Sequence, residues 1–420
     1  MSILFKGRYI LKDYLEEPIE NEGILVNDGV IVDVGDFQRL KKETDEVVDL
    51  GDVIVAPSFA NTHSHIAMVV LRGIGEGKKL HDWLEQVWGI EAKLDYELLF
   101  YANIVGIGEL VSSGVTSFLD FYDVPPMLRA LREIDGPLNA RLGLAFMDKV
   151  PYMKEESWRR LKSLSQIRDD VRSQGYDLFV SPHSLYSVSE ELLRELFRLE
   201  GYKYQIHFAE NPEEVAEIKS IYNRDPVDVL IHLGALDKWI ILAHSVMVPP
   251  EKLNELARPN VYISHCPVSN ARLGSGVAPL LEMVRRGVNV TIGTDGAGSS
   301  ETLDIFEEIR LANFMMRAVT GEIMSIKAIM KMASYGGHVA LGVQAGKLLP
   351  GMNADFITYD LRKLYPSWDV VSSLAYQGRP EVVKDVVVKG RFIKKDGSLV
   401  FNELYKKALD RIIGFIQEKG

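Results

Sequence analysis

Residues 56–73 read APSFANTHSHIAMVVLRG and place two histidines, His63 and His65, one residue apart where an apolar stretch ends. In an extended strand, side chains two residues apart project from the same face, so both imidazoles are expected to point at one spot. This arrangement offers two ligands to one metal ion, although two neighbouring histidines can also form a simple hydrogen-bonded pair. The choice between these interpretations depends on the rest of the chain.

Apolar stretches of the same kind recur between about residue 58 and residue 350, separated by amphipathic segments such as EELLRELFRLEG and APLLEMVRRG. Eight candidate strands can be counted: VIVAPSFAN, VTSFLDF, RLGLAFM, DLFVSPH, YQIHFAE, IILAH, VYISH and VNVTIGTD. The alternation is typical of βα units around a parallel sheet. Eight units indicate an α/β fold of the (β/α)8, or TIM-barrel, type, although a doubly wound sheet also fits the count.

Chemically reactive side chains fall at or just past the carboxyl ends of these strands. They are His63, His65, His183, His207, His244, His265 and Asp295. In a barrel, all strand ends of this kind meet at one rim, where catalytic residues gather. Their placement favours the barrel over the open sheet.

The two ends of the chain have a different pattern, with short β-branched runs between Gly and Asp turn signals. We expect residues 1–57 and 350–420 to form a composite β-sandwich domain that includes a C-terminal amphipathic helix. Residues 58–349 would form the barrel inserted between them.

Composition limits the classes of function. The 420 residues carry a net charge of -11, which argues against a nucleic-acid surface. A single cysteine, Cys266, fits a reducing compartment. The start of the sequence has no secretory-signal pattern, and no apolar run approaches the roughly 20 residues that span a bilayer. We therefore expect a cytoplasmic protein that acts on a small molecule and has no nucleic-acid or membrane partners. These features also allow a homo-oligomer.

Three histidines and one aspartate on the predicted rim form a plausible ligand set: His63, His65, His207 and Asp295. Three imidazoles and a carboxylate suit one divalent metal, most simply Zn²⁺ with Fe²⁺ as the alternative, and leave a position for water. Such a metal lowers the pKa of its water toward neutrality. Asp295 alone could equally be a helix cap, but a cap does not explain the histidines that share its rim.

Two further rim residues are candidates for proton transfer. Glu210 follows His207 by three residues, just before a helix expected to begin after Asn211 with Pro212 in its first turn. It could instead belong to an acidic helix start. His244 could be a packed core residue, or it could orient an attacking water.

Five segments together resemble one known family: NTHSH at 61–65, IHFAE at 206–210, AHSV at 243–246, SHCPVSNARLGSG at 264–276 and GTDGAGSS at 293–300. They are similar to the amidohydrolase superfamily, and within it to the aminohydrolases of methylthioadenosine and S-adenosylhomocysteine, which are related to the chlorohydrolases. GKLLPGMNADFITYD at 346–360 extends the resemblance over nearly the whole chain.

The resemblance implies a metal-dependent deaminase of 5′-modified adenosines, with His63, His65, His207 and Asp295 as ligands. An activated water would attack C6 of the adenine ring, and ammonia would leave. Glu210 would protonate ring N1, Asp295 would accept the proton of the water, and His244 would orient it. Glu210 and Asp295 would thus also contact the substrate.

The resemblance also implies roles in substrate binding. Glu91 would accept hydrogen bonds from the ribose hydroxyls, His183 would contact the substrate, and Trp83 would stack in the pocket. Each could instead be structural. Two-metal relatives carry a bridging lysine after the fourth strand, where this sequence has His183, so we expect one metal.

One departure bears on the substrate. Relatives that favour S-adenosylhomocysteine are expected to hold its carboxylate with an arginine near the end of the third strand, but RLGLAFMDKVPYM at 141–153 has only Arg141 at its start and Lys149 past its end. This shifts the expectation toward smaller 5′ groups, as in methylthioadenosine, 5′-deoxyadenosine or adenosine. A hydrolase of another heteroaromatic ring, such as guanine or a triazine, and a non-catalytic metal-binding scaffold are the alternatives.

Overall fold

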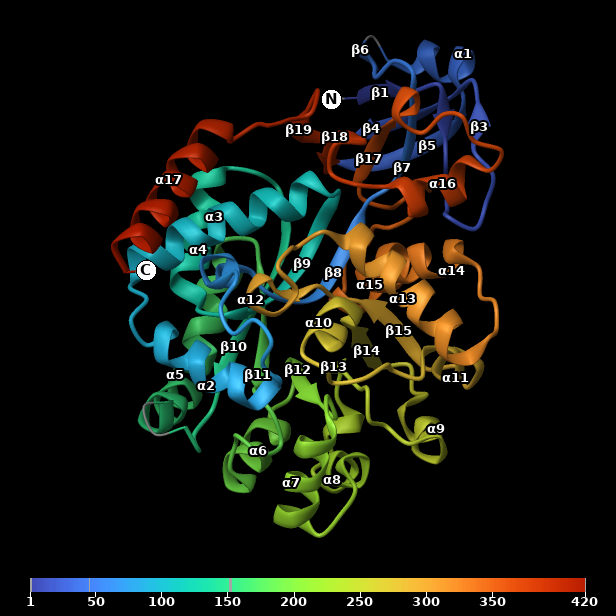
Figure 1. The fold of residues 1–420 in the computed structure, drawn as a ribbon. Helices are drawn as coiled ribbons and strands as arrows, with labels where there is room; N and C mark the ends of the chain where they lie inside the picture. The colour runs from blue at the N-terminus through green and yellow to red at the C-terminus, as the bar shows by residue number, and fades with distance from the viewer. Residues whose placement is uncertain (1, 45, 151–152, 420) are drawn as a thin grey trace.

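A barrel of parallel strands surrounded by helices occupies most of the molecule (Figure 1). The computed structural model describes residues 2–44, 46–150 and 153–419. The barrel strands are β8 (Phe59–His65), β9 (Val115–Tyr122), β10 (Asn139–Phe146), β11 (Asp177–Pro182), β12 (Lys203–Phe208), β13 (Ile240–His244), β14 (Val261–His265), β15 (Asn289–Ile292) and β16 (Asp295–Gly296). β8 to β15 lie side by side in chain order and β16 lies beside β8, so the predicted α/β barrel is confirmed.

The barrel is closed by its last strand, which is interrupted. β15 pairs with β14, whereas β16, only two residues further on, pairs in parallel with β8 through Asp295 and Ser64. β15 and β16 are therefore two halves of the eighth strand, and Gly293 and Thr294 lie at the break. A side chain on Gly293 would collide with Ser264 and His63, since a Cβ there would lie 2.4 Å from Ser264 Oγ.

The first barrel strand begins later than we expected. We predicted one strand over VIVAPSFAN, but the structure contains β7 (Val53–Pro57), which belongs to another sheet, followed by β8. Pro57 has no N–H to donate to a continuing ladder, so the chain leaves one sheet here and enters the next. His63 and His65 consequently lie at the carboxyl end of a strand that is buried along its whole length.

Two further sheets come from the two ends of the chain. One has the order β5-β4-β1-β6, from β1 (Ser2–Lys6), β4 (Glu22–Asn27), β5 (Val30–Asp36) and β6 (Glu46–Asp49). The other has the order β20-β19-β18-β17-β7-β2-β3, from β2 (Tyr9–Ile10), β3 (Ile19–Glu20), β7, β17 (Phe356–Asp360), β18 (Val383–Val388), β19 (Arg391–Lys395) and β20 (Ser398–Leu399). Phe5 and Ile24 of the first sheet pack with Val55 and Phe356 of the second in one buried cluster, as in a β-sandwich.

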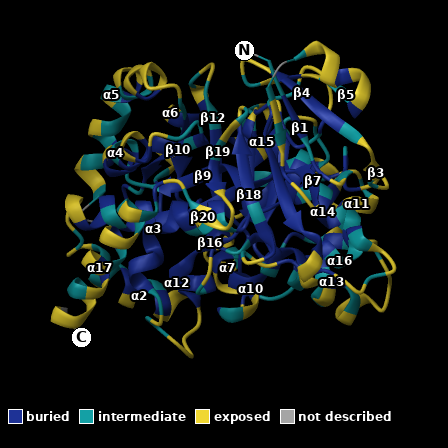
Figure 2. Ribbon diagram, turned by 90° about the horizontal axis from the view of Figure 1, so that it is seen from above, coloured by how far each residue is buried: buried dark blue, intermediate teal, exposed yellow. Residues whose placement is uncertain are grey.

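Helices follow the barrel strands and cover the sheet. They are α2 (Leu80–Glu91), α3 (Tyr96–Ser112), α4 (Val124–Ile134), α5 (Lys154–Ser173), α6 (Glu190–Arg198), α7 (Pro212–Tyr222), α8 (Pro226–His232), α9 (Leu253–Leu256), α10 (Pro267–Arg272), α11 (Leu280–Arg285), α12 (Ala297–Ser300), α13 (Ile305–Thr320), α14 (Ile326–Lys331) and α15 (Gly337–Leu341). Among the described helices, none is both long and apolar enough to cross a membrane. Figure 2 shows the barrel strands buried and the outer helix faces exposed.

The outermost helices belong to the two chain ends. The short α1 (Phe37–Leu40) and α16 (Val370–Gln377) lie beside the sandwich sheets in Figure 1, whereas α17 (Asn402–Lys419) runs along α3 of the barrel. Gly108 of α3 makes this contact possible, because a Cβ there would lie 2.4 Å from the Tyr405 ring. The division into domains at residues 57 and 350 stays a prediction.

Candidate metal centre

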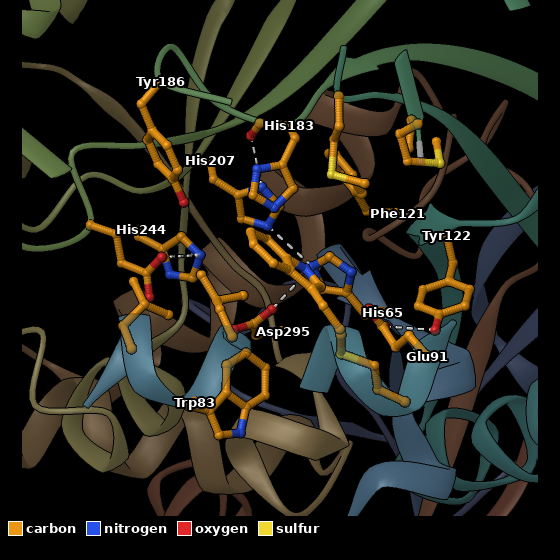
Figure 3. A pocket seen from close by; sticks show the side chains of 18 of the residues that line it. His65, Trp83, Glu91, Phe121, Tyr122, His183, Tyr186, His207, His244 and Asp295 are labelled. Atoms are coloured by element: carbon orange, nitrogen blue, oxygen red, sulfur yellow. Dashed lines mark hydrogen bonds and ion pairs between the residues drawn. The ribbon is translucent and has the colours of Figure 1, made fainter. Parts of the chain in front are cut away.

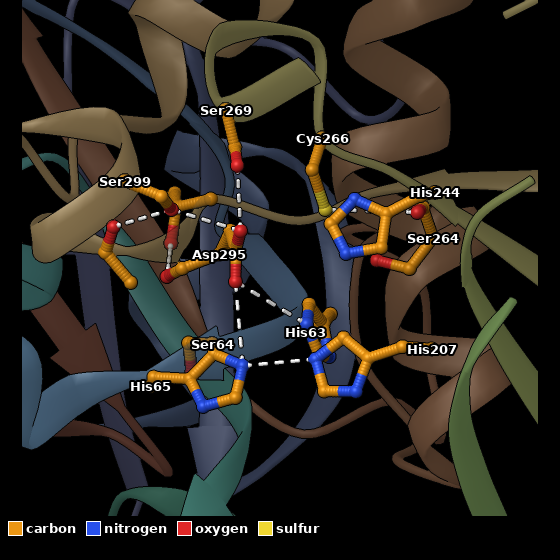
Figure 4. Close-up of polar contacts among 12 residues, drawn as sticks. His63, Ser64, His65, His207, His244, Ser264, Cys266, Ser269, Asp295 and Ser299 are labelled. Carbon is orange, nitrogen blue, oxygen red and sulfur yellow. Dashed lines mark hydrogen bonds and ion pairs between the residues drawn. The ribbon is translucent and has the colours of Figure 1, made fainter. Parts of the chain in front are cut away.

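Four residues from three strands converge at the carboxyl end of the barrel (Figure 4). His63 and His65 come from β8, His207 from β12 and Asp295 from β16, and one donor atom of each lies within 4.8 Å of the others. His65 Nε2 lies 3.1 Å from His207 Nε2 and 3.3 Å from Asp295 Oδ1. Donor atoms around a tetrahedral zinc with bonds of about 2.1 Å are separated by about 3.4 Å, so the spacing suits one ion.

Neighbouring groups fix the tautomers of two of these histidines. His207 Nδ1 lies 2.9 Å from the carbonyl oxygen of His183, which can only accept, so Nδ1 carries the proton and Nε2 keeps its lone pair. His63 Nδ1 faces Gln205 Oε1 at 3.4 Å, and Gln205 Nε2 donates to the Asp120 carbonyl and to Ser181. His63 Nε2 is buried and has no hydrogen-bond partner among the described residues, which is the state expected of a metal ligand.

Burial keeps the imidazoles of His65 and His207 neutral. It lowers the pKa of His65 to about 3 and that of His207 well below the usual value, with the neighbouring histidines adding to the effect for His207. Neutral imidazole is the form that binds a metal. His65 and His207 are therefore ready to bind a cation without first losing a proton.

The two carboxylate oxygens of Asp295 make different contacts. Oδ2 accepts hydrogen bonds from Ser269 Oγ at 2.7 Å and Ser299 Oγ at 2.9 Å, whereas Oδ1 faces His63 Nε2 at 3.4 Å. Burial alone would raise the pKa of Asp295, but the close contact with His63 and the nearby imidazoles of His244 and His65 hold it well below its usual range. Asp295 is thus an ionised carboxylate with one oxygen directed at the cluster.

Glu210 and His244 form a second group beside the cluster. Glu210 Oε2 lies 3.6 Å from His244 Nε2, and Ser275 Oγ donates to Glu210 Oε1 at 3.4 Å. Burial, together with the charge of Asp295, raises the pKa of Glu210 to about 8. Near neutral pH this side chain is a protonated acid, which can donate a proton to a bound molecule.

The backbone around Glu210 is held by a second carboxylate. Glu214 accepts the backbone N–H of Ala209 at 3.1 Å and that of Glu210 at 2.7 Å. Asn211 caps α7 by accepting the N–H of Glu214, and Pro212 is the first helical residue, which confirms the predicted helix start. Glu214 therefore fixes the turn that directs Glu210 into the site.

Four residues around the cluster have left-handed backbone conformations that are unfavourable for non-glycine residues. They are Ala209 (φ 47°), His244 (φ 70°), Ser245 (φ 54°) and Asp295 (φ 58°). Each such residue costs about 1–3 kcal/mol and persists only where its surroundings enforce it. The strain lies at the ends of β12 and β13 and at the start of β16, where the chain turns to direct side chains inward.

A cavity of about 270 Å³ opens over the cluster and is lined largely by apolar side chains. Figure 3 shows His244 and Tyr186 on one side and Glu91 with Tyr122 on the other, with His65 and Asp295 between them. A small, mostly apolar cleft with a few convergent polar groups is the usual form of a ligand site.

Sequence comparison agrees with this architecture. The model of the amidohydrolase family matches residues 54–393, which include every strand of the barrel and the whole cluster. The chain belongs to the amidohydrolase family.

Several relatives of this amidohydrolase match it along nearly its full length. A 5-methylthioadenosine/S-adenosylhomocysteine deaminase of Pyrococcus abyssi is 32% identical, with 98% of each chain covered. A 5′-deoxyadenosine deaminase of Methanosarcina acetivorans is also 32% identical and covers 93% of this chain and 92% of its own.

Solved structures share the fold. A zinc-bound adenosine deaminase from Xanthomonas campestris superimposes with a TM-score of 0.88 at 24% identity, covering 98% of each chain. A zinc complex of atrazine chlorohydrolase from Arthrobacter aurescens TC1 gives a TM-score of 0.88 at 20% identity, covering 98% of this chain and all of its own. At such identities the likeness establishes the fold alone.

The amidohydrolase places all three residues predicted to line the substrate pocket in its cavity wall: Glu91, His183 and Trp83. Tyr122 Oη donates to Glu91 Oε1 at 2.6 Å, and burial raises the pKa of Glu91 to about 7. His183 follows β11, and Trp83 Nε1 donates to the Gly298 carbonyl at 3.2 Å. Their roles in binding stay predictions.

Sequence reasoning missed the residues that support the site. Gln205 lies two positions before His207 and on the same strand face, a spacing that could have suggested its contact with His63. Asn270, whose Oδ1 lies 2.9 Å from His244 Nδ1, is inside the SHCPVSNARLGSG motif. Arg160 lines the cavity from α5, and nothing in that charged helical stretch pointed to it.

Proposed function

We propose that this amidohydrolase deaminates the adenine ring of 5′-modified adenosines to the inosine analogue and ammonia. The observation that carries the proposal is the pairing of a protonated acid, Glu210, with an ionised carboxylate, Asp295, in one cavity above a four-ligand cluster. Hydrolytic removal of a ring amine needs one group that gives a proton to the ring and another that takes one from water. The names of the full-length relatives support the adenosine-type substrate.

The cluster fits one divalent cation, and Zn²⁺ is the ion that three imidazoles and a carboxylate suit best, with Fe²⁺ next. When bound, such a cation supplies a water of lowered pKa as the nucleophile. His63, His65 and His207 would hold it through Nε2, and Asp295 through Oδ1.

The side chains divide the proton transfers between them. Glu210 would protonate ring N1, which makes C6 more electrophilic. Asp295 Oδ1 would accept a proton from the attacking water and pass it to the departing amine, while Ser269 and Ser299 keep Oδ2 in place. His244 Nε2 faces Glu210 and would orient the water.

Glu91 supports a ribosylated substrate over a free base. Tyr122 occupies one of its oxygens, and the other remains able to accept a hydrogen bond from a ribose hydroxyl. A free guanine or triazine ring has no ribose hydroxyl to donate to Glu91. A single metal, a cytoplasmic location and a homo-oligomeric state stay predictions.

The test is a kinetic panel that measures ammonia release from methylthioadenosine, 5′-deoxyadenosine, adenosine, S-adenosylhomocysteine, guanine and a chlorotriazine. We expect the highest kcat/KM with an adenosine that bears a 5′ substituent. Turnover of guanine or the triazine above all adenosines would overturn the proposal in favour of another ring hydrolase. Metal-loaded protein that releases nothing from any of them would favour the non-catalytic alternative.

A further inference from the structure

One wall of the cavity is formed at the neighbouring ends of β9 and β10. Tyr122 ends β9 and Asp123 follows it, Ala145 and Met147 lie at the end of β10, and Arg160 extends from α5. Tyr122 binds Glu91, so this wall continues directly from the position proposed for the ribose. A substituent on the 5′ carbon of a bound nucleoside would extend along it.

Arg160 is the only lysine or arginine among the described residues that line the cavity. Its Nε donates to Glu156 Oε1 at 3.0 Å, its Nη1 donates to the Ala145 carbonyl at 2.9 Å, and its Nη2 lies 3.6 Å from Asp123 Oδ1. The side chain is only 15% exposed. All three of its nitrogens therefore already face acceptors, and two carboxylates balance its charge.

The rest of the described cavity lining contributes carboxyl groups and no further lysine or arginine. Five carboxyl side chains line the cavity: Glu91, Asp123, Glu210, Glu214 and Asp295. Burial raises the pKa of Asp123, and the nearby guanidinium of Arg160 opposes part of this rise. A ligand carboxylate at this wall would meet Asp123, while Arg160 already pairs with Asp123 and Glu156, and juxtaposed like charges penalise binding.

We propose that this wall is the 5′ subsite and that Asp123, by neutralising Arg160, makes the enzyme select uncharged 5′ substituents over carboxylates. Met147 and Met153 line the same region and offer polarizable thioether surface to an alkyl or thioether group. The inference rests on the proposed function and narrows it: of two 5′ groups of equal size, the uncharged one gives a better substrate than the anionic one.

The wild-type protein tests the role of charge directly. Two 5′-thioadenosines of equal size are compared, one carrying a carboxypropyl group and the other the corresponding primary amide. We expect kcat/KM for ammonia release to be at least about tenfold higher for the amide, which corresponds to one unfavourable charge contact. Equal values, or a preference for the carboxylate, would overturn the inference while leaving the deaminase function intact. Failure of both compounds and of methylthioadenosine would overturn the proposed function and this inference with it.

The substitution Asp123→Asn tests the residue. It removes one carboxylate from Arg160 with little change in shape, so the guanidinium can pair with a ligand carboxylate. We expect the ratio of kcat/KM for the carboxylate to that for the amide to rise about tenfold. Glu155→Gln is the matched control, because Glu155 is an exposed carboxylate on α5, the helix that carries Arg160. An unchanged ratio in Asp123→Asn, or an equal rise in the control, would overturn the assignment to Asp123.

Discussion

Glu210 is the residue on which the proposed chemistry depends most. Its carboxyl group is buried beside His244, and it donates a proton only while it stays protonated. We expect Glu210→Gln to retain metal but to lose deaminase activity by about 10²–10⁴-fold, the usual contribution of a general acid. Steady-state ammonia release and metal content of the purified variant check this. Glu213→Gln, an exposed change in the same turn, is the control, and unchanged turnover in Glu210→Gln would exclude Glu210 from the mechanism.

The same residue predicts a pH dependence. Burial raises the pKa of Glu210 to about 8, so the acid is protonated below that pH and loses its proton above it. Activity that requires the protonated form must therefore fall as pH rises through the pKa. A bound cation adds positive charge nearby and moves this pKa downward. We expect kcat/KM to decline on the alkaline side from a pH at or below about 8, and this decline to be absent from the residual activity of Glu210→Gln.

At the level of elements, the site residues that the sequence could predict lie mostly at the ends of the strands. His63, His207 and Asp295 could be grouped because each follows an apolar run, and the parallel ends of a barrel share one rim. Contacts such as Gln205 with His63, which are 142 residues apart, depend on side-chain packing across the barrel that periodicity does not encode. Arg160 was missed for the same reason, since Asp123 and the Ala145 carbonyl, which it contacts in the cavity wall, lie outside its own helix.

The predicted strand boundaries were wrong where the chain passes from one sheet to another and where a strand is interrupted. VIVAPSFAN reads as one apolar run, but the chain passes from β7 to β8 within it. VNVTIGTD divides into β15 and β16 at Gly293. Both breaks allow the barrel to close, and closure depends on contacts between the first and last strands, which no local pattern reports.

Gly143 of β10 links the packing of the barrel interior to the metal cluster. A Cβ at this position would lie 2.1 Å from Gln205 Nε2 and 2.5 Å from the Asp120 carbonyl oxygen. Gln205 would have to move, and it is the partner of His63 Nδ1. We expect Gly143→Ala to destabilise the fold by about 1–3 kcal/mol through overpacking and to weaken metal retention. Thermal unfolding and metal content after dialysis measure both effects.

The control is Gly414→Ala in α17, where a Cβ meets nothing within 4 Å. A Gly143→Ala protein with normal metal retention would contradict the proposed role of Gln205.

Over the whole molecule, the cluster joins parts of the barrel that are far apart in the sequence. Its ligands come from β8 at the start of the barrel, β12 in the middle and β16 at the closing seam, where Asp295 pairs with Ser64. A cation bound by all three strands links the first strand to the last. Binding only to the folded state stabilises it, by about 2.7 kcal/mol when the free ion is at 100 times its Kd.

Metal removal should therefore lower stability as well as activity. We expect a chelator to reduce the Tm of the wild-type protein, and addition of Zn²⁺ to restore both the Tm and ammonia release. His207→Ala should bind far less metal and show a Tm that no longer responds to the chelator, because the link to β12 is lost. His81→Ala is the control, since His81 is an exposed histidine outside the cluster. A wild-type Tm that is insensitive to the chelator although metal has been removed would show that the barrel seam closes without the ion, and that the strained turns at Asp295 and His244 are held by the protein alone.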